Sequence, residues 1–353
     1  MSPAFWNGKR VFLTGHTGFK GSWLTLWLEQ LGATVCGFSL APATTPALFD
    51  DAKVAGSCEH HIGDIRDYGA VARAMSAFKP DIVLHLAAQA IVRTSYEDPI
   101  ETYGSNVMGT VHVLEAARKT PSVRVIVNVT SDKCYENREW LWGYREIDPM
   151  GGHDPYSSSK GCAELVASAF ARSYFHLKDG PVLGSARAGN VIGGGDWAHD
   201  RLIPDIVRAF LAGKAVEIRQ PDSVRPWQHV LEPLSGYILL AEKLWQGGQN
   251  FAGGWNFGPD ASAVMPVRAV ADTMVRIWGA DSCWIDRSDP HALHEAKLLQ
   301  LDSTKARINM GWQPRWAFRT ALEATADWYR KTHEGASPRD LCLQQIAQYA
   351  AAH

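Results

Sequence analysis

Short apolar runs alternate with longer apolar patterns of helical spacing through the first half of the chain. The run Arg10–Thr14 predicts a strand, and the glycines after it lead into a helical pattern over residues 23–31 that ends at Gly32. A second apolar run, over residues 34–38, predicts the next strand. Strand, glycine-rich turn, helix and strand in this order indicate a βαβ unit.

The same alternation continues beyond this unit. The further elements that the pattern predicts are helices over 68–78, 102–119 and 156–176 and strands over 82–86, 123–129 and 182–187. Helices that alternate with buried strands predict an α/β fold, a Rossmann-type doubly wound parallel sheet with helices on both faces. Ligands of such sheets bind at the carboxyl ends of the strands.

A change in composition and in the pattern of apolar residues, about halfway along the chain, predicts a second, smaller unit. Glycine and proline become frequent there, and the regular alternation stops. The apolar helix predicted over 232–245 is long enough to rejoin the sheet, so we expect residues 1–186 and 226–252 in the first unit. Residues 187–225 and 253–353 then form a partly interleaved α/β unit that roofs a cleft at the sheet.

Composition and charge exclude several classes of protein. The 353 residues carry 35 Lys and Arg against 37 Asp and Glu, a formal net charge of −2, so no strong positive field points to nucleic acid or anionic membrane. The six cysteines lie far apart without a CxxC pair, which argues against a zinc finger or a disulfide framework. The chain begins without the apolar segment of a signal peptide and has no run of about 18 apolar residues, so we expect a cytoplasmic protein.

The glycine-rich turn after the first strand is the first candidate site. Its sequence, TGHTGFKG over residues 14–21, permits a tight turn and lets a pyrophosphate approach backbone N–H groups at a helix N-terminus. We therefore predict dinucleotide binding by Gly15, Thr17, Gly18, Phe19, Lys20 and Gly21. Lys20 either adds a charge near the phosphates or is a solvated side chain in the first helical turn.

The end of the second predicted strand says little about which dinucleotide binds. No charged residue occurs from 33 to 49, so neither the carboxylate expected for NAD nor the arginine expected for NADP is visible. We favour NAD, because a 2′-phosphate without a nearby cation would be poorly neutralised. Ser39 at this strand end is a candidate cofactor contact, and Asp64 and Ile65, beyond the third strand, are candidate contacts of the adenine.

A tyrosine and a lysine four residues apart form the strongest catalytic pattern. Tyr156 and Lys160, in the sequence YSSSK, share one face of the predicted helix, which brings an ammonium close to a phenol. A nearby positive charge lowers the phenol pKa from its usual value of about 10 and makes Tyr156 a usable base. Ser131 follows the predicted strand 123–129 and adds to this pattern.

Together these motifs resemble the extended short-chain dehydrogenase/reductases, the family that oxidises and rearranges nucleotide-linked sugars. The resemblance extends over nearly the whole chain and includes LAAQ over 86–89, Asn106 and TSD over 130–132. It implies NAD as cofactor, with further contacts from Leu86, Ala87, Ala88, Gln89 and Asn106. The stretches 187–197 and 223–233 are similar to those of members that act on CDP-glucose. CDP-glucose is thus the implied substrate, in deoxysugar biosynthesis for surface polysaccharides such as lipopolysaccharide O-antigen.

The resemblance also implies roles for the catalytic residues. Ser131 and Tyr156 would hydrogen-bond the sugar 4-hydroxyl, while Lys160 tunes Tyr156 and holds the nicotinamide ribose. Hydride leaves C4 for the cofactor, water is eliminated across C5 and C6, and the hydride returns to C6. The implied product is CDP-4-keto-6-deoxy-D-glucose.

The acid and base of the elimination depart from the family pattern. The related dTDP-glucose enzymes carry an adjacent Asp-Glu pair, whereas this chain has Asp132 and Lys133. Asp132 can serve as the acid toward the 6-hydroxyl. Lys133 takes the C5 proton only if its surroundings keep it partly neutral; otherwise it stabilises the enolate or is a solvent-facing loop lysine. Both side chains can reach one sugar only if the chain has left the strand at Ser131.

The nucleotide end of the substrate has its own candidate contacts. They are Asn190, Gly194, Arg201, Arg219 and Arg225. Arg219 and Arg225 suit the diphosphate because a guanidinium makes two parallel bonds to phosphate oxygens, whereas Asn190, Gly194 and Arg201 contact either the diphosphate or the base. The segment 291–295 contains two histidines and a glutamate, but its spacing matches no zinc motif, so we expect no metal.

Two other functions remain open from the residues. A sugar-nucleotide epimerase or 4-reductase of the same family would share Tyr156 and Lys160 but would need no acid at C6. A non-catalytic NAD-binding regulator would be expected to lack one of these two residues. Asp132 and Lys133 therefore favour the dehydratase over the first alternative, and the intact Tyr-Lys pattern disfavours the second.

The resemblance also implies self-association. The family usually forms dimers by pairing two long helices per subunit, here those predicted over 102–119 and 156–176, so we expect a homodimer or a dimer of dimers. The apolar stripe Val107, Val111 and Leu114 either lies in that interface or faces the sheet.

Overall fold

A seven-stranded parallel sheet forms the centre of the computed structural model, which describes residues 2–177, 180–279, 282–288 and 298–352. In sheet order its strands are β11 (Gly253–Phe257), β6 (Val182–Ala188), β5 (Val125–Val129), β4 (Ile82–His85), β1 (Arg10–Thr14), β2 (Thr34–Ser39) and β3 (Glu59–Ile62). All neighbouring strands in it are parallel. The order runs outward in both directions from β1, which confirms the predicted doubly wound fold.

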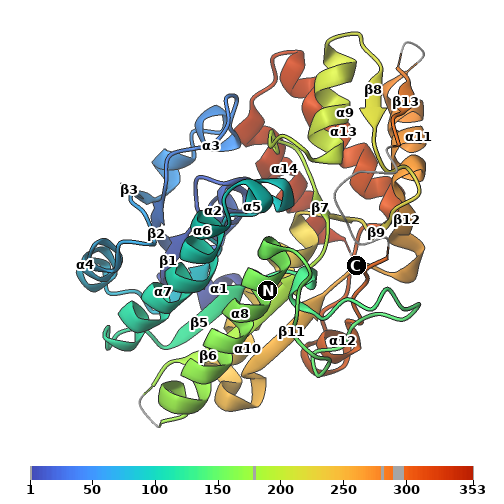
Figure 1. Ribbon diagram of the computed structural model, residues 1–353. Coiled ribbons are helices and arrows are strands. Elements are labelled where there is room, and N and C mark those ends of the chain that lie inside the picture. The colour runs from blue at the N-terminus through green and yellow to red at the C-terminus, as the bar shows by residue number, and fades with distance from the viewer. Residues whose placement is uncertain (1, 178–179, 280–281, 289–297, 353) are drawn as a thin grey trace.

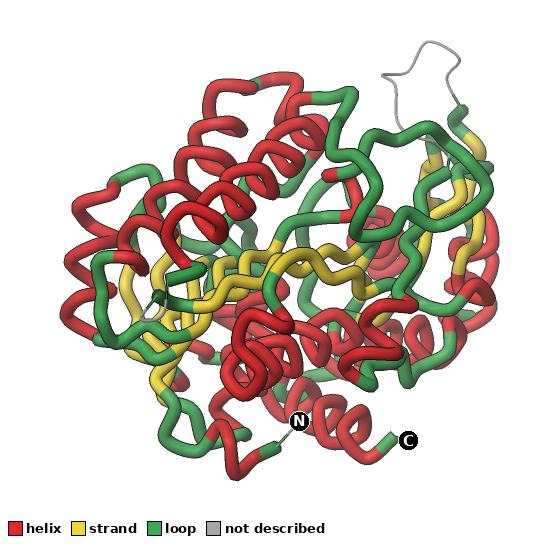
Figure 2. Tube along the Cα trace, turned by 90° about the horizontal axis from the view of Figure 1, so that it is seen from below, coloured by secondary structure: helices red, strands yellow, loops and turns green. Residues whose placement is uncertain are grey.

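Helices cover both faces of the sheet (Figure 2). One face carries α4 (Tyr68–Phe78), α7 (Gly109–Arg118) and α8 (Pro155–Phe170), and the other carries α2 (Phe19–Gln30) and α10 (Leu231–Gly247). Strand side chains alternate between the two cores: Val11 and Leu13 pack on the α2 side, and Phe12 packs on the α4 side. Among the described residues, no helix has the length and apolarity needed to cross a bilayer.

Two of the predicted helices each contain a π-helical turn. The one predicted over 102–119 consists of α6 (Pro99–Tyr103), a π-helical turn and α7. The one predicted over 156–176 is α8 followed by a π-helical turn over Ala171–Phe175. The extra residue in such a turn rotates the side chains that follow it, which apolar spacing does not reveal. Leu114 of the predicted stripe lies in the core against the sheet.

A smaller unit stands beside the sheet, on the right in Figure 1. Its short strands pair as β7 (Val191–Ile192) with β10 (Gln228–His229), β8 (Val216–Ile218) with β13 (Trp284–Asp286), and β9 (Val224–Pro226) with β12 (Val264–Pro266). Its helices are α9 (Leu202–Leu211), α11 (Val267–Trp278), α12 (Thr304–Met310) and α13 (Phe318–His333). These elements come from two stretches of the chain, so the unit is interleaved with the sheet.

The chain divides between the two units differently from the prediction at two places. β11 is the edge strand of the main sheet, paired with β6 from Gly253↔Gly184 to Phe257↔Ala188, so the predicted limit at 252 falls before the last strand. Helix α14 (Pro338–Ala351) packs on α2, where the ring centroids of Trp27 and Tyr349 lie 5.8 Å apart. Apolar spacing shows that such segments are buried but not which partner buries them.

Three buried histidines make stability depend on pH. Burial lowers the pKa of His85 and of His229 to about 3, and that of His16 to about 4. These rings stay neutral in the folded protein, whereas in the unfolded chain they take up protons below about pH 6.5. The unfolded state therefore binds more protons as the pH falls from that value, and stability falls with it. The expected slope is up to about 1.4 kcal/mol per pH unit for each histidine.

Urea unfolding at pH 7.5 and 5.5 measures this slope. The substitution His229→Gln is expected to reduce the slope of the unfolding free energy against pH. The reduction corresponds to about one proton, because the group that takes up a proton on unfolding is removed. His333→Gln, at an exposed position, is the matched control and leaves the slope unchanged. Equal slopes for the His229 variant and the parent protein would contradict the prediction.

Candidate active site

A cavity of about 770 Å³ opens at the carboxyl ends of the sheet strands and is lined by both units. All the predicted catalytic residues line it: Ser131, Asp132, Lys133, Tyr156 and Lys160. The predicted cofactor contacts on its wall are Gly15, Thr17, Gly18, Phe19, Lys20, Gly21, Ser39, Asp64, Ile65, Leu86, Ala87, Ala88 and Gln89. The predicted substrate contacts on its wall are Asn190, Arg201, Arg219 and Arg225. Asn106 and Gly194 do not line it.

The glycine-rich turn is shaped for a close approach of backbone groups. Gly15 has a φ of +80°, and a Cβ there would lie 2.8 Å from the Ala87 nitrogen. A Cβ at Gly21 would lie 2.0 Å from the Gly15 carbonyl oxygen, so α2 can begin against the turn only with a glycine at that position. The first N–H groups of α2 thus stand at the cavity wall, where they fit the pyrophosphate of a dinucleotide.

Hydroxyl groups line the cavity where β2 ends. The Thr17 hydroxyl donates to the Leu40 carbonyl at 2.8 Å, and the Ser39 hydroxyl lies 2.8 Å from the Thr17 oxygen. Asp64, farther along the same wall, is paired with Arg66 at 2.6 Å, and this hydrogen-bonded contact lowers the pKa of its carboxyl. A neutral, hydroxyl-bearing wall suits an unphosphorylated ribose better than a 2′-phosphate.

His16 fills the space beside Gly37, a packing role that the sequence analysis missed. A Cβ at Gly37 would lie 2.3 Å from the His16 ring, and the His16 Nε2 is 2.6 Å from the His60 Nδ1. The ring therefore takes the room that a side chain in the middle of β2 would need. A glycine inside a strand pattern is a signal of such a close approach, although it does not say which group approaches.

Asn106 supports the cavity wall from behind. Its Oδ1 accepts a hydrogen bond from the Gln89 N–H at 2.9 Å, and its Nδ2 donates to the Ser159 hydroxyl at 2.8 Å. Thr14 acts in the same way, since its hydroxyl oxygen accepts from the Ala87 N–H at 3.1 Å. In the structure Asn106 thus supports the backbone that lines the cavity, and its contact with the cofactor stays a prediction.

The catalytic turn follows β5 directly. The strand ends at Val129, and a 3-10 turn over Asp132–Cys134 begins after Ser131, whose hydroxyl oxygen accepts from the Lys133 N–H at 3.3 Å. The chain has therefore left the strand at Ser131. This is the condition under which neighbouring side chains can reach one ligand, and both members of the Asp-Lys pair line the cavity.

Tyr156 and Lys160 lie on the cavity side of α8, with the lysine Nζ 5.9 Å from the centre of the phenol ring. Burial raises the pKa of Tyr156 to about 12, and a hydrogen bond with Ser131 opposes this rise. Burial lowers the pKa of Lys160 to about 8. The expected lowering of the phenol pKa is thus absent in the protein alone, because desolvation of the phenolate is the largest effect, and the hydrogen bond with Ser131 and the charge of Arg201 oppose it only in part.

Asp132 is a buried carboxyl group with one unpaired oxygen. Its Oδ1 accepts a hydrogen bond from the Ser131 hydroxyl at 2.9 Å, whereas its Oδ2 has no partner among the described residues. A Cβ at Gly189 would lie 2.8 Å from that oxygen, so the glycine makes room for it. Burial raises the pKa of Asp132, and the charge of Lys133 opposes the rise. A carboxyl with a raised pKa keeps its proton more readily and can donate it.

A buried ion pair joins α8 to β6 behind the catalytic residues. The Arg187 Nη2 lies 2.7 Å from the Glu164 Oε2, and the other glutamate oxygen accepts from the Thr130 hydroxyl at 2.5 Å. Glu164 is one helical turn beyond Lys160, so the pair ties the catalytic helix to the strand end before Ser131. This pair was not predicted from the sequence, although the glutamate continues the four-residue spacing of the Tyr-Lys pattern.

Arginines line the part of the cavity that the smaller unit forms. The Arg201 Nη1 lies 3.0 Å from the Asp196 Oδ2, and the Arg219 Nη2 lies 2.8 Å from the Asp200 Oδ1. Arg225 is buried on the same wall. Several guanidinium groups at one end of a cavity suit a diphosphate.

Gly194 lies behind this wall instead of in it. Its carbonyl accepts a hydrogen bond from the Trp23 indole at 2.9 Å, and a Cβ at this position would lie 2.1 Å from the Trp328 ring. The structure shows a packing role for this glycine, and its contact with the substrate stays a prediction. Consecutive glycines in a sequence do not reveal which of them faces the ligand.

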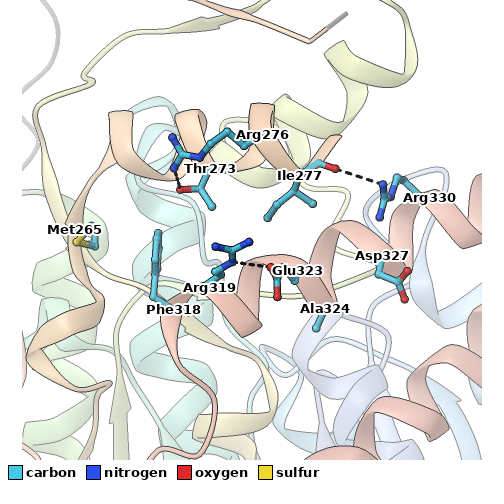
Figure 3. Close-up of a pocket in the computed structure, with 10 residues that line it drawn as sticks. All are labelled: Met265, Thr273, Arg276, Ile277, Phe318, Arg319, Glu323, Ala324, Asp327 and Arg330. Carbon is cyan, nitrogen blue, oxygen red and sulfur yellow. Dashed lines mark hydrogen bonds and ion pairs between the residues drawn. The ribbon is translucent and has the colours of Figure 1, made fainter. Parts of the chain in front are cut away.

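Two other candidate sites lie among the described residues, and neither contains the catalytic pattern. Cys36, Glu59 and His61, on β2 and β3, are close enough to hold a metal ion, but none of them lines the cavity. A second cavity, of about 820 Å³, lies between α11 and α13 (Figure 3) and contains none of the predicted catalytic residues. Its volume is similar, so chemistry and not size identifies the site. The segment 291–295 lies outside the described residues.

Comparison with known proteins relates both units to enzymes of sugar nucleotides. The model of the GDP-mannose 4,6 dehydratase family matches residues 12–325. A CDP-glucose 4,6-dehydratase of Salmonella typhimurium is 53% identical over 352 residues, which cover 99% of this chain and 98% of that protein.

Solved structures share the fold. A UDP-glucose 4-epimerase of Thermus thermophilus, complexed with NAD, superposes with a TM-score of 0.77 at 25% identity and covers 91% of this chain and 99% of its own. A dTDP-glucose 4,6-dehydratase of Streptomyces venezuelae, with NAD and TYD bound, has a TM-score of 0.76 at 25% identity and covers 94% of this chain and 99% of its own. The similarity therefore includes the smaller unit as well as the sheet.

Proposed function

This chain belongs to the GDP-mannose 4,6 dehydratase family, within the extended short-chain dehydrogenase/reductases, and we propose that it converts CDP-D-glucose into CDP-4-keto-6-deoxy-D-glucose with NAD as its cofactor. The observation that carries the proposal is the presence of Asp132 and Lys133 on the same cavity wall as Ser131, Tyr156 and Lys160. An acid for the 6-hydroxyl is what a 4,6-dehydratase needs beyond the groups that oxidise C4. The 53% identity with a CDP-glucose 4,6-dehydratase supports the cytidine form of the substrate.

The residues of the glycine-rich turn would hold NAD. The first N–H groups of α2 would bind its pyrophosphate, and the hydroxyl-bearing wall at Thr17 and Ser39 would bind the adenosine ribose. When bound, NAD supplies a hydride acceptor for C4, a hydride donor for C6 and, while oxidised, a positive charge. The chain's own residues orient the sugar and move the protons.

Ser131 and Tyr156 act on the sugar 4-hydroxyl. Both line the cavity, and the phenolate of Tyr156 takes the hydroxyl proton while C4 is oxidised. Because burial raises the pKa of Tyr156 to about 12 in the protein alone, positive charge in the filled site must stabilise the phenolate. Lys160 provides such a charge: its pKa of about 8 leaves it mostly protonated at pH 7.

The turn after β5 carries out the elimination. Asp132 donates its proton to the 6-hydroxyl, which leaves as water; the raised pKa and the unpaired Oδ2 support this role. Lys133 acts at C5, where it either removes the proton or stabilises the enolate. A lysine that accepts the proton must be neutral and one that stabilises the enolate must be charged, so substitution can distinguish the two roles.

Incubation with CDP-glucose deuterated at C4, without added reductant, tests the proposed function. Loss of one water with deuterium at C6 is the expected result. Retained mass with inversion at C4 would indicate an epimerase, and a requirement for stoichiometric reduced cofactor would indicate a reductase. NAD binding without any turnover would favour a non-catalytic regulator. A parallel incubation with dTDP-glucose tests whether the enzyme distinguishes a substrate that carries cytosine from one that carries thymine.

We also propose that the chain forms a homodimer, or a dimer of dimers, in the cytoplasm. Exposed apolar side chains on the helices predicted to pair support the dimer: Ile100 is 85% exposed, Met108 48% and Leu165 61%. The six cysteines are free thiols, as expected in a reducing compartment.

The substitution Leu165→Glu is expected to lower the mass measured by light scattering to that of one chain, because a carboxylate in an apolar interface is desolvated without a partner. Ile308→Glu, at a side chain 77% exposed on α12, is the matched control and keeps the parental mass. A Leu165 variant that still dimerises would show that these helices are not the interface.

A further inference from the structure

The loop over residues 193–196 lies between the cavity and helix α13. Gly193, Gly195 and Asp196 line the cavity, whereas Gly194 packs on Trp328 of α13. The residues of α13, all of which the structure describes, do not themselves line the cavity. The path of this part of the wall therefore depends on a helix that does not itself line the cavity.

Tyr329 of α13 holds the loop through its hydroxyl group. The hydroxyl donates to the carbonyl oxygen of Asp196 at 2.5 Å and also points to that of Gly193 at 3.4 Å. Its ring meets the Trp197 ring edge-on, with centroids 5.1 Å apart, and the side chain is 1% exposed. One buried donor thus serves two carbonyl groups of the same loop and fixes its curvature.

Asp196 connects the loop that Tyr329 holds to an arginine of the cavity wall. Its Oδ2 lies 3.0 Å from the Arg201 Nη1, and its Oδ1 accepts from the Ala198 N–H at 3.2 Å. Asp196 is the main cause of the raised pKa of Arg201, and Tyr156 also contributes to it. The guanidinium is therefore close enough to the catalytic phenol to interact with it, and its direction is set by a carboxylate whose backbone Tyr329 holds.

The outer side of α13 is anchored separately. Arg319, Glu323 and Asp327 of this helix line the cavity between α11 and α13, as Figure 3 shows for the labelled side chains. Arg330 donates to the Ile277 carbonyl of α11 at 3.3 Å. The helix is thus held on both sides and can serve as a fixed reference for the loop.

We propose that Tyr329 is a positioning residue for substrate binding that acts through Asp196 on Arg201. The ligand is the diphosphate of a nucleotide sugar, so this inference rests on the proposed function for the identity of the substrate. Loss of the Tyr329 hydroxyl keeps the Arg201 guanidinium in the site but removes the hydrogen bonds that fix the loop over residues 193–196. The loop then no longer orients the guanidinium. Substrate affinity is therefore affected while the groups that carry out the chemistry remain intact.

Steady-state kinetics of the NAD-loaded Tyr329→Phe variant with CDP-glucose test the inference. KM is expected to rise about three- to tenfold, the change associated with the loss of one neutral hydrogen bond, while kcat stays within about twofold. The dissociation constant for NAD is expected to stay the same. Tyr349→Phe is the matched control: it removes a buried hydroxyl that donates to Glu232 at 2.5 Å between α10 and α14, and it leaves KM unchanged.

A double-mutant cycle separates positioning from general loosening of the fold. On an Arg201→Met background the Tyr329→Phe change is expected to add nothing to KM, because the group it positions is gone. Independent, multiplying effects would overturn the inference. If Tyr329→Phe fails to fold, Asp196→Asn tests the same route, and an unchanged KM for that variant is equally decisive against it.

The parent protein distinguishes this inference from the proposed function. If it binds NAD but neither binds nor converts CDP-glucose, the proposed function fails. If it converts CDP-glucose and Tyr329→Phe has the parental KM, the proposed function stands and the positioning role is overturned.

Discussion

Replacing Tyr156 by phenylalanine is expected to lower kcat by about 10²- to 10⁴-fold, the range associated with removal of a positioned acid or base. The phenol is buried on the cavity wall next to Ser131, and its ring is kept in the variant, so binding of NAD and CDP-glucose is expected to change little. The formation of reduced nicotinamide in a single turnover measures the affected step directly. Deuterium at C4 of the sugar should slow that step in the parent protein.

Tyr237→Phe is the matched control for this substitution. Its hydroxyl is also buried, interacts electrostatically with Tyr156 and has no hydrogen-bond partner among the described residues. Loss of that hydroxyl is expected to leave kcat nearly unchanged. A Tyr156 variant with more than about a tenth of parental kcat would mean that another group removes the 4-hydroxyl proton.

Substitutions at Lys133 are expected to separate oxidation from elimination. Lys133→Ala should retain partial hydride transfer, since Ser131, Tyr156 and Lys160 remain, but should release dehydrated product about 10²-fold more slowly. Quenched reactions should then contain reduced nicotinamide and an undehydrated 4-ketone. Turnover equal to that of the parent protein would exclude a role for Lys133 in the elimination.

Lys133→Arg then distinguishes the two chemical roles of this residue. A guanidinium keeps the positive charge but does not give up its proton near neutral pH. If Lys133 stabilises the enolate, the arginine variant keeps much of its activity, and if Lys133 is the C5 base, the variant resembles Lys133→Ala. Exchange of solvent deuterium into C5 provides an independent measure of proton removal.

The parts of the fold that follow from local signals could be predicted from the sequence. The strand Arg10–Thr14, the glycine-rich turn and α2 are adjacent in the chain, and each is marked by its own residues. Tyr156 and Lys160 could be paired because helical spacing alone brings them to one face. The limit of the sheet near residue 252 was wrong, because β11 joins β6 through a contact between distant segments that apolar periodicity does not encode.

The site was harder to predict where a residue's role depends on what packs behind it. Asn106 and Gly194 have residue types that suit ligands, yet the structure turns the first toward Ser159 and the second toward Trp328. One neighbouring positive charge predicts a lowered pKa for Tyr156, whereas in the folded protein desolvation has the largest effect and raises it. Burial is a property of the whole fold, so a two-residue motif does not contain it.

The last helix of the chain has a consequence for how the protein is made. Leu341, Cys342 and Ile346 of α14 belong to the core that α2 also enters, and Arg339 pairs with Glu29 at 2.6 Å. During synthesis the nucleotide-binding half emerges from the ribosome first, but it lacks this cover until residues 338–351 have been made. Growing chains are therefore expected to expose the tryptophan-rich side of α2 until then, the kind of surface that chaperones shield.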